Sequence, residues 1–352
     1  MKKIGIIGHF GFKKNLANGQ TVKTKIITKE IKKQVGTDDV VCIDTHQAKK
    51  KLIVLIFKIF KMMINCENII ILPAHNGVII FSPMLAVLNK LFHRRLHYIV
   101  IGGWLPEYVK QKKYLKKALL CFDGIYVETR TMKKLMEMQG FHNVYILPNC
   151  KKLDILDENK LVYSRIKPFK ICTFSRVMKE KGIEDIIKAV NIINTRFSGN
   201  VFCLDIYGQI EPEYLVQFKK MEEKFPQYIK YQGVVSYDKS TYILKDYFAL
   251  IFPTLFFTEG VPGTIIDAYA SGVPVISSKW QSFEDVIEDG IVGYGYKFGD
   301  LNALIEVLNY IAENPEKING LKKNCLSKAK EFTSENVVCR FLEGDENMPG
   351  VF

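Results

Sequence analysis

The feature that most restricts the fold of this chain is a regular alternation of short apolar runs with stretches of helical periodicity. Ile183, Ile186 and Val190 recur at spacings of three and four, which is typical of a helix with one buried face. Runs rich in β-branched and aromatic residues flank such stretches, and these residue types favour strands. Strands and helices that alternate at this pitch form βαβ units, in which the strands pair in parallel. The strands expected in the second half are Ile171–Phe174, Phe202–Tyr207, Ile229–Tyr231, Phe248–Phe252, Pro274–Ser277 and Gly293–Lys297.

The first half repeats the pattern, so the chain is predicted to contain two α/β domains, each with a Rossmann-like, doubly wound sheet. Its 352 residues suffice for two separate cores. We expect a first domain over 1–165, a second domain over 166–335 and a tail over 336–352 that packs back on the first domain. Ligands of such sheets bind beyond the carboxyl ends of the strands, so two sheets facing each other form a cleft. The strands expected in the first half are Lys3–Ile7, Val40–Ile43, Ile69–Leu72, His97–Ile101, Gly124–Val127 and Val144–Leu147.

The segment 253–277, PTLFFTEGVPGTIIDAYASGVPVIS, carries the most information about function. A strand ends at its start, and Pro262 stands where the first turn of a helix is expected. The backbone N–H groups of Gly263 and Thr264 would then point out of the helix N-terminus, which is a suitable site for an anion.

Two carboxylates of the same segment are candidates for hydroxyl recognition. Glu259, followed by Gly260, precedes the helix and could accept a hydrogen bond from a sugar hydroxyl beside the phosphates. Asp267, further along the helix, could reach a ribose. The alternative is an ordinary strand-to-helix loop with a solvated acid.

The segment 173–182, TFSRVMKEKG, places two cations after the first strand of its sheet. Arg176 offers a planar fork for a diphosphate, and Lys181 offers a compact charge beside it. The alternative is a pair of ordinary surface cations.

Together these segments resemble the family-4 retaining glycosyltransferases of the GT-B fold, whose bacterial members build polysaccharides and capsules. Arg176 and Lys181 match the family's diphosphate-binding pair, and Glu259 and position 267 match its two acids spaced eight apart. Three further segments match in the family's order. They are Gly8–Gly19 (GHFGFKKNLANG), in which Gly19 approaches the donor phosphates, Tyr145–Cys150 (YILPNC) and Leu204–Gly208 (LDIYG), in which Gly208 lies near the nucleobase.

The resemblance implies a nucleoside diphosphate sugar, in most cases a UDP-sugar, as donor and a glycan or polyprenyl-linked glycan as acceptor. It implies a hexosyltransferase that retains anomeric configuration, in which Glu259, Arg176 and Lys181 are catalytic. The spacing DxD, with which other glycosyltransferases hold a divalent metal, does not occur in the sequence. We therefore expect no metal and no further cofactor, because protein cations would stabilise the leaving diphosphate.

The chain departs from the family at two positions. Asp267 replaces the usual Glu and shortens its reach by ~1.5 Å. Gly102-Gly103-Trp104 stands where many relatives have a histidine near the reacting sugar. The acceptor-side candidates are therefore open: His9 and His75 each follow a predicted strand but could equally be structural, and Gly103 and Trp104 complete the set.

Three other functions remain as alternatives. The first is a nucleotide-sugar epimerase of the same fold, and the second is a non-catalytic relative that binds nucleotide-sugar. The third is a nucleic-acid-binding protein, suggested by the basic first half, but no RNA-binding aromatic motif or helix-turn-helix pattern supports it, so no nucleic acid is expected as a partner.

Charge and hydropathy predict where the protein works. Residues 1–165 hold 29 Lys and Arg against 12 Asp and Glu, whereas residues 166–352 hold 21 against 25. Lys49–Lys51 precede the apolar stretch 52–63, and a further lysine group lies at 110–117, as in basic helices that lie on anionic membranes. The alternative is that Leu52–Phe60 forms a buried core helix. The eight cysteines include no CxxC pair, and no apolar run approaches the ~20 residues of a membrane span. We expect a cytoplasmic protein, peripheral on the inner face of the cell membrane.

Overall fold

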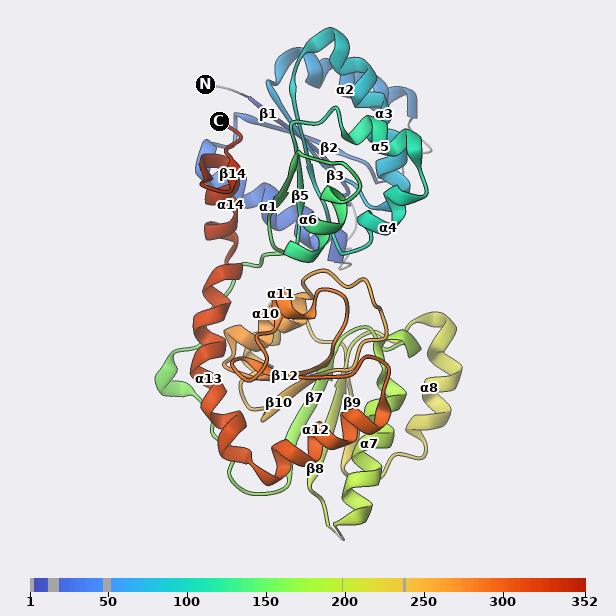
Figure 1. Cartoon of the computed structure of the whole chain (residues 1–352), viewed down its shortest axis with the longest axis vertical. Helices are drawn as coiled ribbons and strands as arrows, with labels where there is room; N and C mark the ends of the chain where they lie inside the picture. The colour runs from blue at the N-terminus through green and yellow to red at the C-terminus, as the bar shows by residue number, and fades with distance from the viewer. Residues whose placement is uncertain (1–2, 12–18, 47–51, 198, 237–238) are drawn as a thin grey trace. The chain divides into compact units, whose positions relative to one another are not determined.

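The computed structural model describes residues 3–11, 19–46, 52–197, 199–236 and 239–352, which form two compact units (Figure 1). Unit 1 contains Met1–Lys152 and Phe332–Phe352, and unit 2 contains Leu153–Glu331. The first boundary therefore lies earlier than the expected 165/166. Residues 153–165 belong to unit 2 because the amide of Leu156 donates to the carbonyl of Ala270 at 2.8 Å and Ser164 exchanges two backbone hydrogen bonds with the Asn319 side chain.

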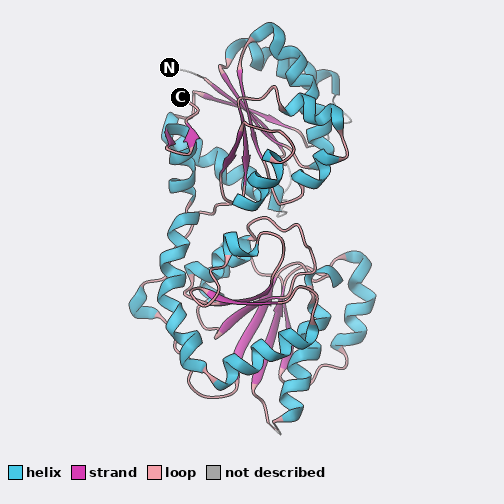
Figure 2. Ribbon diagram, viewed as in Figure 1, coloured by secondary structure: helices cyan, strands magenta, loops and turns pink. Residues whose placement is uncertain are grey.

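Unit 1 is built on a sheet of six parallel strands in the order β2-β1-β3-β4-β5-β6. In Figure 2 the strands are magenta and the helices that flank them are cyan. The side chains alternate between the faces of the sheet: Ile4 and Ile6 of β1 pack with α1 and α14, whereas Ile7 packs with α2 and α3. The strands are β1 (Ile4–Gly8), β2 (Val40–Asp44), β3 (Asn68–Leu72), β4 (Arg95–Ile99), β5 (Gly124–Val127) and β6 (Val144–Ile146). The helices are α1 (Gly19–Val35), α2 (Leu52–Asn65), α3 (His75–Phe92), α4 (Leu105–Lys110), α5 (Lys113–Leu119), α6 (Arg130–Glu137) and α14 (Ser334–Glu343).

Strand β4 begins and ends earlier than the predicted His97–Ile101. Ile101 continues the apolar run, but the backbone turns just after it at Gly102, whose φ is +83°. The strand therefore ends at Ile99, and the residues that follow form a loop at the carboxyl edge of the sheet.

The C-terminal segment is part of unit 1. Helix α14 packs on α1, and the ring of Phe341 meets that of Tyr126 on β5 edge to face at 4.8 Å. A short hairpin of β13 (Gly344–Asp345) and β14 (Met348–Pro349) follows the helix.

Unit 2 repeats the architecture with six parallel strands in the order β12-β11-β10-β7-β8-β9. Its strands are β7 (Phe169–Phe174), β8 (Phe202–Tyr207), β9 (Ile229–Gly233), β10 (Ala249–Phe252), β11 (Val275–Ser278) and β12 (Gly293–Tyr296). Its helices are α7 (Ile183–Arg196), α8 (Leu215–Glu222), α9 (Ser240–Leu244), α10 (Gly263–Ala270), α11 (Phe283–Val286), α12 (Leu301–Glu313) and α13 (Pro315–Ala329).

The two doubly wound sheets agree with the predicted α/β class. The α7 periodicity also holds, since Ile183, Ile186 and Val190 are all buried in the core of unit 2. Among the helices of the described residues, none combines the length and the apolar character that crossing a bilayer requires.

Candidate functional site

The strand order of unit 2 points to one edge of the sheet as the place for a ligand. Strands β7 and β10 are neighbours, yet the chain continues from β7 to β8 on one side and from β10 to β11 on the other. In open α/β sheets a ligand binds beyond the carboxyl ends of two such strands. The loops that follow β7 and β10 contain Arg176, Lys181 and Glu259.

These two loops are fixed to each other by their backbones. Leu255 donates its amide hydrogen to the carbonyl of Glu180 at 2.8 Å. Gly182 has a φ of +68°, and a Cβ at this position would collide with the carbonyl oxygen of Pro253. Only glycine fits both the backbone conformation and the close approach. The two loops are therefore held in one geometry, with little freedom to move apart.

Lys181 and Glu259 meet across this junction. The Lys181 ammonium donates to Glu259 Oε1, and Thr254 Oγ1 donates to the same oxygen at 3.0 Å. The two side chains are largely buried, at 12% and 17% exposure. The Lys181 Nζ atom also lies 4.9 Å from the centroid of the Phe256 ring, within cation–π range. The predicted phosphate-binding cation and the predicted sugar-binding carboxylate are thus direct neighbours.

Arg176 is not part of this contact. Its Nη1 atom lies 2.6 Å from Glu211 Oε1, and its side chain is 60% exposed. The Glu211 backbone amide donates to the carbonyl of Val177 at 3.0 Å, so this carboxylate is anchored to the loop after β7. A diphosphate that binds Arg176 has to compete with Glu211 for the guanidinium.

Gly208 brings the loop after β8 against the loop after β7. Its φ is +134°, and a Cβ there would collide with the carbonyl oxygen of Ser175. Tyr231 Oη donates to the Gly208 carbonyl at 2.8 Å, and the Gly208 amide donates to Gly233 at the same distance. The glycine is therefore required by packing alone, whether or not a nucleobase lies nearby.

Helix α10 begins directly after the loop that carries Glu259. Pro262 is its N-cap, so Gly263 and Thr264 occupy the first turn, where backbone N–H groups have no acceptor within the helix. Gly260 is buried just before it. The hydroxyl of Thr264 is buried and finds no hydrogen-bond partner among the described residues. The first turn of α10 therefore offers donors that no described group of the protein satisfies.

Asp267 lies one turn further along α10 and is only 4% exposed. Its Oδ2 atom accepts a hydrogen bond of 2.7 Å from Ser240 Oγ at the start of α9. The predicted contact with a ribose thus requires a hydroxyl that joins or replaces Ser240.

In unit 1, the acceptor-side candidates fall into two separate groups at the carboxyl edge of the sheet. His9 follows β1, and its Nδ1 lies 2.8 Å from Thr21 Oγ1 while its Nε2 lies 3.1 Å from Nδ1 of His46. Burial, and secondarily the neighbouring His46, lower the pKa of His9. This favours a neutral imidazole, which can accept a proton.

The second group is aromatic. His75 at the start of α3 stacks on Trp104, with ring centroids 3.8 Å apart and planes 26° apart, and Tyr108 meets both rings edge to face. Trp104 is oriented by a hydrogen bond of 2.7 Å from its Nε1 to the Ile101 carbonyl, and Gly103 is buried beside it. Partial burial lowers the pKa of His75.

The predicted glycine-rich loop Gly8–Gly19 lies largely outside the described residues, because residues 12–18 are not among them. Gly19 itself begins α1 and is exposed, and a Cβ there would meet no atom of the described residues within 4 Å. The described part of the chain therefore imposes no steric need for glycine at position 19.

A buried ion pair at the same edge of unit 1 was not predicted from the sequence. Lys23 Nζ on α1 lies 2.5 Å from Glu128 Oε1, and both side chains are 3% exposed. Lys23 also donates to the Val100 carbonyl at 3.1 Å, and Glu128 accepts from the Gly102 amide at 3.0 Å. Because buried charges are tolerated only when well paired, this pair fixes α1 against the loop that leads to Trp104. Glu128 directly follows β5, and His46, the partner of His9, lies just after β2. The position of these two residues at strand ends is the sequence signal that indicates them.

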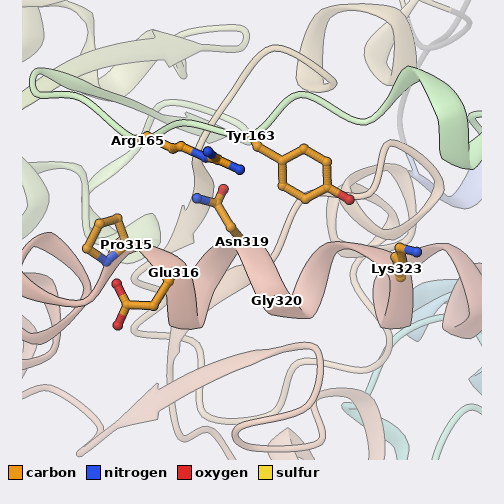
Figure 3. Close-up of a pocket in the computed structure, with 7 residues that line it drawn as sticks. All are labelled: Tyr163, Arg165, Pro315, Glu316, Asn319, Gly320 and Lys323. Carbon is orange, nitrogen blue, oxygen red and sulfur yellow. The ribbon is translucent and has the colours of Figure 1, made fainter.

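A groove of about 520 Å³ in unit 2 does not qualify as a functional site (Figure 3). It lies between the segment 163–165 and α13 and shares no lining residue with the loops after β7 and β10. Asn319 on its floor is already bonded to the Ser164 backbone, and Lys323 pairs with Glu158 at 2.5 Å. These polar groups attach the segment that enters unit 2 to α13.

Comparison with known proteins finds a family match within unit 2. Residues 159–328, slightly less than half of the chain, match the family model described as Glycosyl transferases group 1. The uncharacterized glycosyltransferase MJ1069 of Methanocaldococcus jannaschii is 25% identical over 189 residues, which are 53% of this chain and 46% of that protein. The amylovoran biosynthesis glycosyltransferase AmsK of Erwinia amylovora is 25% identical over 180 residues, 50% of this chain and 44% of that protein. The chain thus spans about half the length of these curated relatives.

Among solved structures, Anabaena Alr3699/HepE in complex with UDP matches with a TM-score of 0.75 at 14% identity, over 97% of this chain and 98% of that chain. At this identity the likeness establishes the fold alone. The fold is the pair of parallel-sheet α/β domains found in GT-B glycosyltransferases.

Proposed function

We propose that this protein is a metal-independent glycosyltransferase. It moves a hexose-type sugar from a nucleoside diphosphate sugar to a glycan or polyprenyl-linked glycan in the synthesis of a cell-surface polysaccharide. The observation that carries the proposal is the contact between Lys181 and Glu259 at the ligand edge of unit 2, within the stretch that matches the glycosyl transferases group 1 model. UDP is the nucleotide we propose, because a solved structure with the same fold is a complex with UDP.

The donor site has to stabilise charge that develops when the bond from the anomeric carbon to the diphosphate oxygen breaks. Lys181 and Arg176 supply two cations. The first turn of α10 supplies backbone N–H groups together with the Thr264 hydroxyl, which has no hydrogen-bond partner in the described part of the chain. Preorganised donors of this kind stabilise a leaving anion without reorganisation during the reaction. In this proposal the diphosphate displaces Glu259 from Lys181 and Glu211 from Arg176.

The displaced Glu259 is then free to hold the sugar. Its carboxylate remains anchored by Thr254 and can accept hydrogen bonds from sugar hydroxyls. The acceptor hydroxyl attacks the anomeric carbon with retention of configuration, and its proton passes to an oxygen of the departing diphosphate. The His75–Trp104 stack and the His9–His46 pair are the groups of unit 1 that we propose for acceptor binding.

The reaction is proposed to take place at the inner face of the cell membrane, with the basic unit 1 docked on anionic lipid. A polyprenyl-linked acceptor is anchored in that membrane, whereas nucleotide sugars are dissolved in the cytoplasm. A peripheral position lets one protein reach both substrates.

The test is release of UDP from a panel of UDP-sugars by the purified protein, with and without short glycan acceptors. We expect acceptor-dependent release with one donor and loss of release in Lys181→Met. Release that needs no acceptor, together with exchange of a sugar proton with solvent, would indicate an epimerase instead. A protein that binds no nucleotide in calorimetry would refute the proposal.

A further inference from the structure

Helix α2 is apolar both on the side that packs against the sheet of unit 1 and on the opposite, exposed side. Leu55, Ile59 and Met62 are buried against the sheet of unit 1. The opposite stripe recurs at spacings of four, three and four residues and is exposed, with Ile53 at 72% and Phe57 at 71% exposure. This stripe consists of Ile53, Phe57, Phe60 and Ile64. The interpretation of Leu52–Phe60 as a purely buried core helix is therefore wrong, since it accounts for the inner face only.

Helix α3 extends this exposed apolar surface. Its outward stripe includes Val87 and Leu91, at 67% and 75% exposure. Helices α2 and α3 lie side by side (Figure 1), and the ring of Phe60 meets that of Phe92 edge to face at 5.2 Å. We use the name α2–α3 surface for a set of exposed apolar side chains on these two helices. They are Ile53, Val54, Ile56, Phe57, Phe60, Ile64, Ile80, Val87 and Leu91.

The charged side chains that α2 and α3 place beside the α2–α3 surface are all positive. Helices α2 and α3 contain three lysines and no Asp or Glu. Lys58, Lys61 and Lys90 are exposed, and their long stems allow the ammonium groups to reach past an apolar layer to its polar boundary. Helix α5, which packs on α3, adds the exposed Lys113 and Lys117.

Arg94, just after α3, is a cation with a structural role. Its Nε donates to the Met63 carbonyl at 2.7 Å and its Nη2 donates to the Ile64 carbonyl at 3.1 Å. It therefore satisfies the last carbonyls of α2 and helps to hold the helix in place.

An apolar stripe bordered by lysines is better suited to bind an anionic lipid leaflet than a second copy of the chain. A second copy of the chain would bring Lys58, Lys61 and Lys90 against the same cations, and this repulsion opposes a symmetric dimer. An anionic lipid leaflet offers hydrocarbon for the apolar side chains and phosphates for the lysines.

We propose that the α2–α3 surface inserts into the interfacial layer of an anionic membrane leaflet. The proposal rests on the membrane position stated under the proposed function and is independent of the donor chemistry. In this proposal the apolar side chains of α2 insert into the leaflet and hold the protein there. The lysines of α5 attract the protein to the anionic lipid from a distance. The two contributions differ in salt dependence, because salt screens the charges but does not weaken apolar burial.

The experiment compares the whole protein and two surface variants in co-sedimentation with vesicles of phosphatidylcholine alone or with about one third phosphatidylglycerol. Ile53→Ser/Phe57→Ser removes the most exposed apolar pair. Its matched control is Val216→Ser/Val234→Ser, which removes two valines that are 68% exposed in unit 2. We expect wild type and control to bind the anionic vesicles alike, and the α2 variant to lose at least about tenfold in partition at both low and high salt.

A spectroscopic variant reports insertion directly. The fluorescence of Phe57→Trp should shift to the blue with anionic vesicles, because the indole leaves water. Calorimetric titration of UDP in each variant checks unit 2 separately, so a failed membrane proposal and a failed donor proposal are distinguishable. The membrane proposal is overturned if wild type stays in the supernatant with anionic vesicles at low salt, or if Ile53→Ser/Phe57→Ser binds as wild type does. It is also overturned if the α2 variant instead dissolves a dimer seen by light scattering.

Discussion

Glu259→Gln should change two measurable quantities in opposite directions, the affinity for UDP and the rate of sugar transfer. The side chain keeps its shape and can still accept the hydrogen bond from Thr254, so the fold should be retained. Loss of the charge releases Lys181 from its partner before any ligand arrives. We therefore expect UDP to bind more tightly to the variant, while sugar transfer falls because the sugar hydroxyls lose the charged carboxylate as their acceptor.

The magnitudes follow from the contact. Couplings between contacting charged residues are ~0.5–3 kcal/mol, and the pair is largely buried at 12% and 17% exposure. If the diphosphate takes over Lys181, wild type gives up this coupling on binding and the variant does not. A coupling of ~1 kcal/mol corresponds to UDP binding about fivefold more tightly. Turnover should fall about a hundredfold, as on loss of one preorganised electrostatic contact.

Calorimetry with UDP and initial rates of sugar transfer measure the two effects. Glu288→Gln is the matched control: Glu288 pairs with Lys328 at 2.8 Å, and Lys328 is 14% exposed, but neither residue lies in the loops after β7 and β10. The control should change neither quantity. Weaker UDP binding combined with unchanged turnover in Glu259→Gln would refute both the pairing and the assignment to the sugar.

Four further outcomes are expected. Arg176→Ala should weaken UDP about tenfold in calorimetry and leave uridine almost unchanged; equal losses for both ligands would mean that the residue acts on folding. Transfer should continue in EDTA, and activity that disappears with EDTA and returns with manganese would contradict metal independence. Gly182→Ala should lower the free energy of unfolding by ~1–3 kcal/mol in urea titrations, because its φ is +68° and its Cβ meets the Pro253 carbonyl. Gly320→Ala, with open space around it in α13, should instead be neutral or stabilising. Burial lowers the pKa of Lys322 to about 8 from 10.5. Between these values the unfolded chain binds more protons, so this residue makes stability rise with pH. The advantage of Lys322→Met over wild type in thermal melts should be largest below pH 8 and vanish near pH 10.5; an advantage independent of pH would contradict the buried charge.

Hydrophobic periodicity was sufficient for most of the fold, because buried strands and one-faced helices leave local patterns. Strand β8 has the predicted bounds Phe202–Tyr207. The hydrophobic pattern did not decide the structure where two different arrangements require the same apolar residues. In α2, one apolar stripe packs on the sheet and the other faces solvent, so the sequence could not tell a core helix from an exposed apolar face. Strand β4 was misplaced because the run of apolar residues continues into a turn at Gly102.

The candidate site was predictable to the extent that it depends on strand ends. Lys181 and Glu259 follow strands that the topology makes neighbours, and their contact follows from that adjacency. The partners that arrive from other loops could not be predicted. Glu211 comes from the segment after β8, and Ser240 from α9. Their approach depends on packing between elements far apart in the sequence, which no local pattern records.

Two ion pairs in the loops of the proposed site bear on how that site would select its ligand. Lys181 is paired with Glu259, and Arg176 is paired with Glu211. A lone anion that takes Lys181 leaves Glu259 as a partly buried carboxylate without its cation, which is unfavourable. A sugar attached to the diphosphate offers hydroxyl donors to the same carboxylate and removes that penalty. In the proposed site, the Lys181–Glu259 contact would therefore favour a ligand that carries a diphosphate and a polyol on one molecule over either group alone.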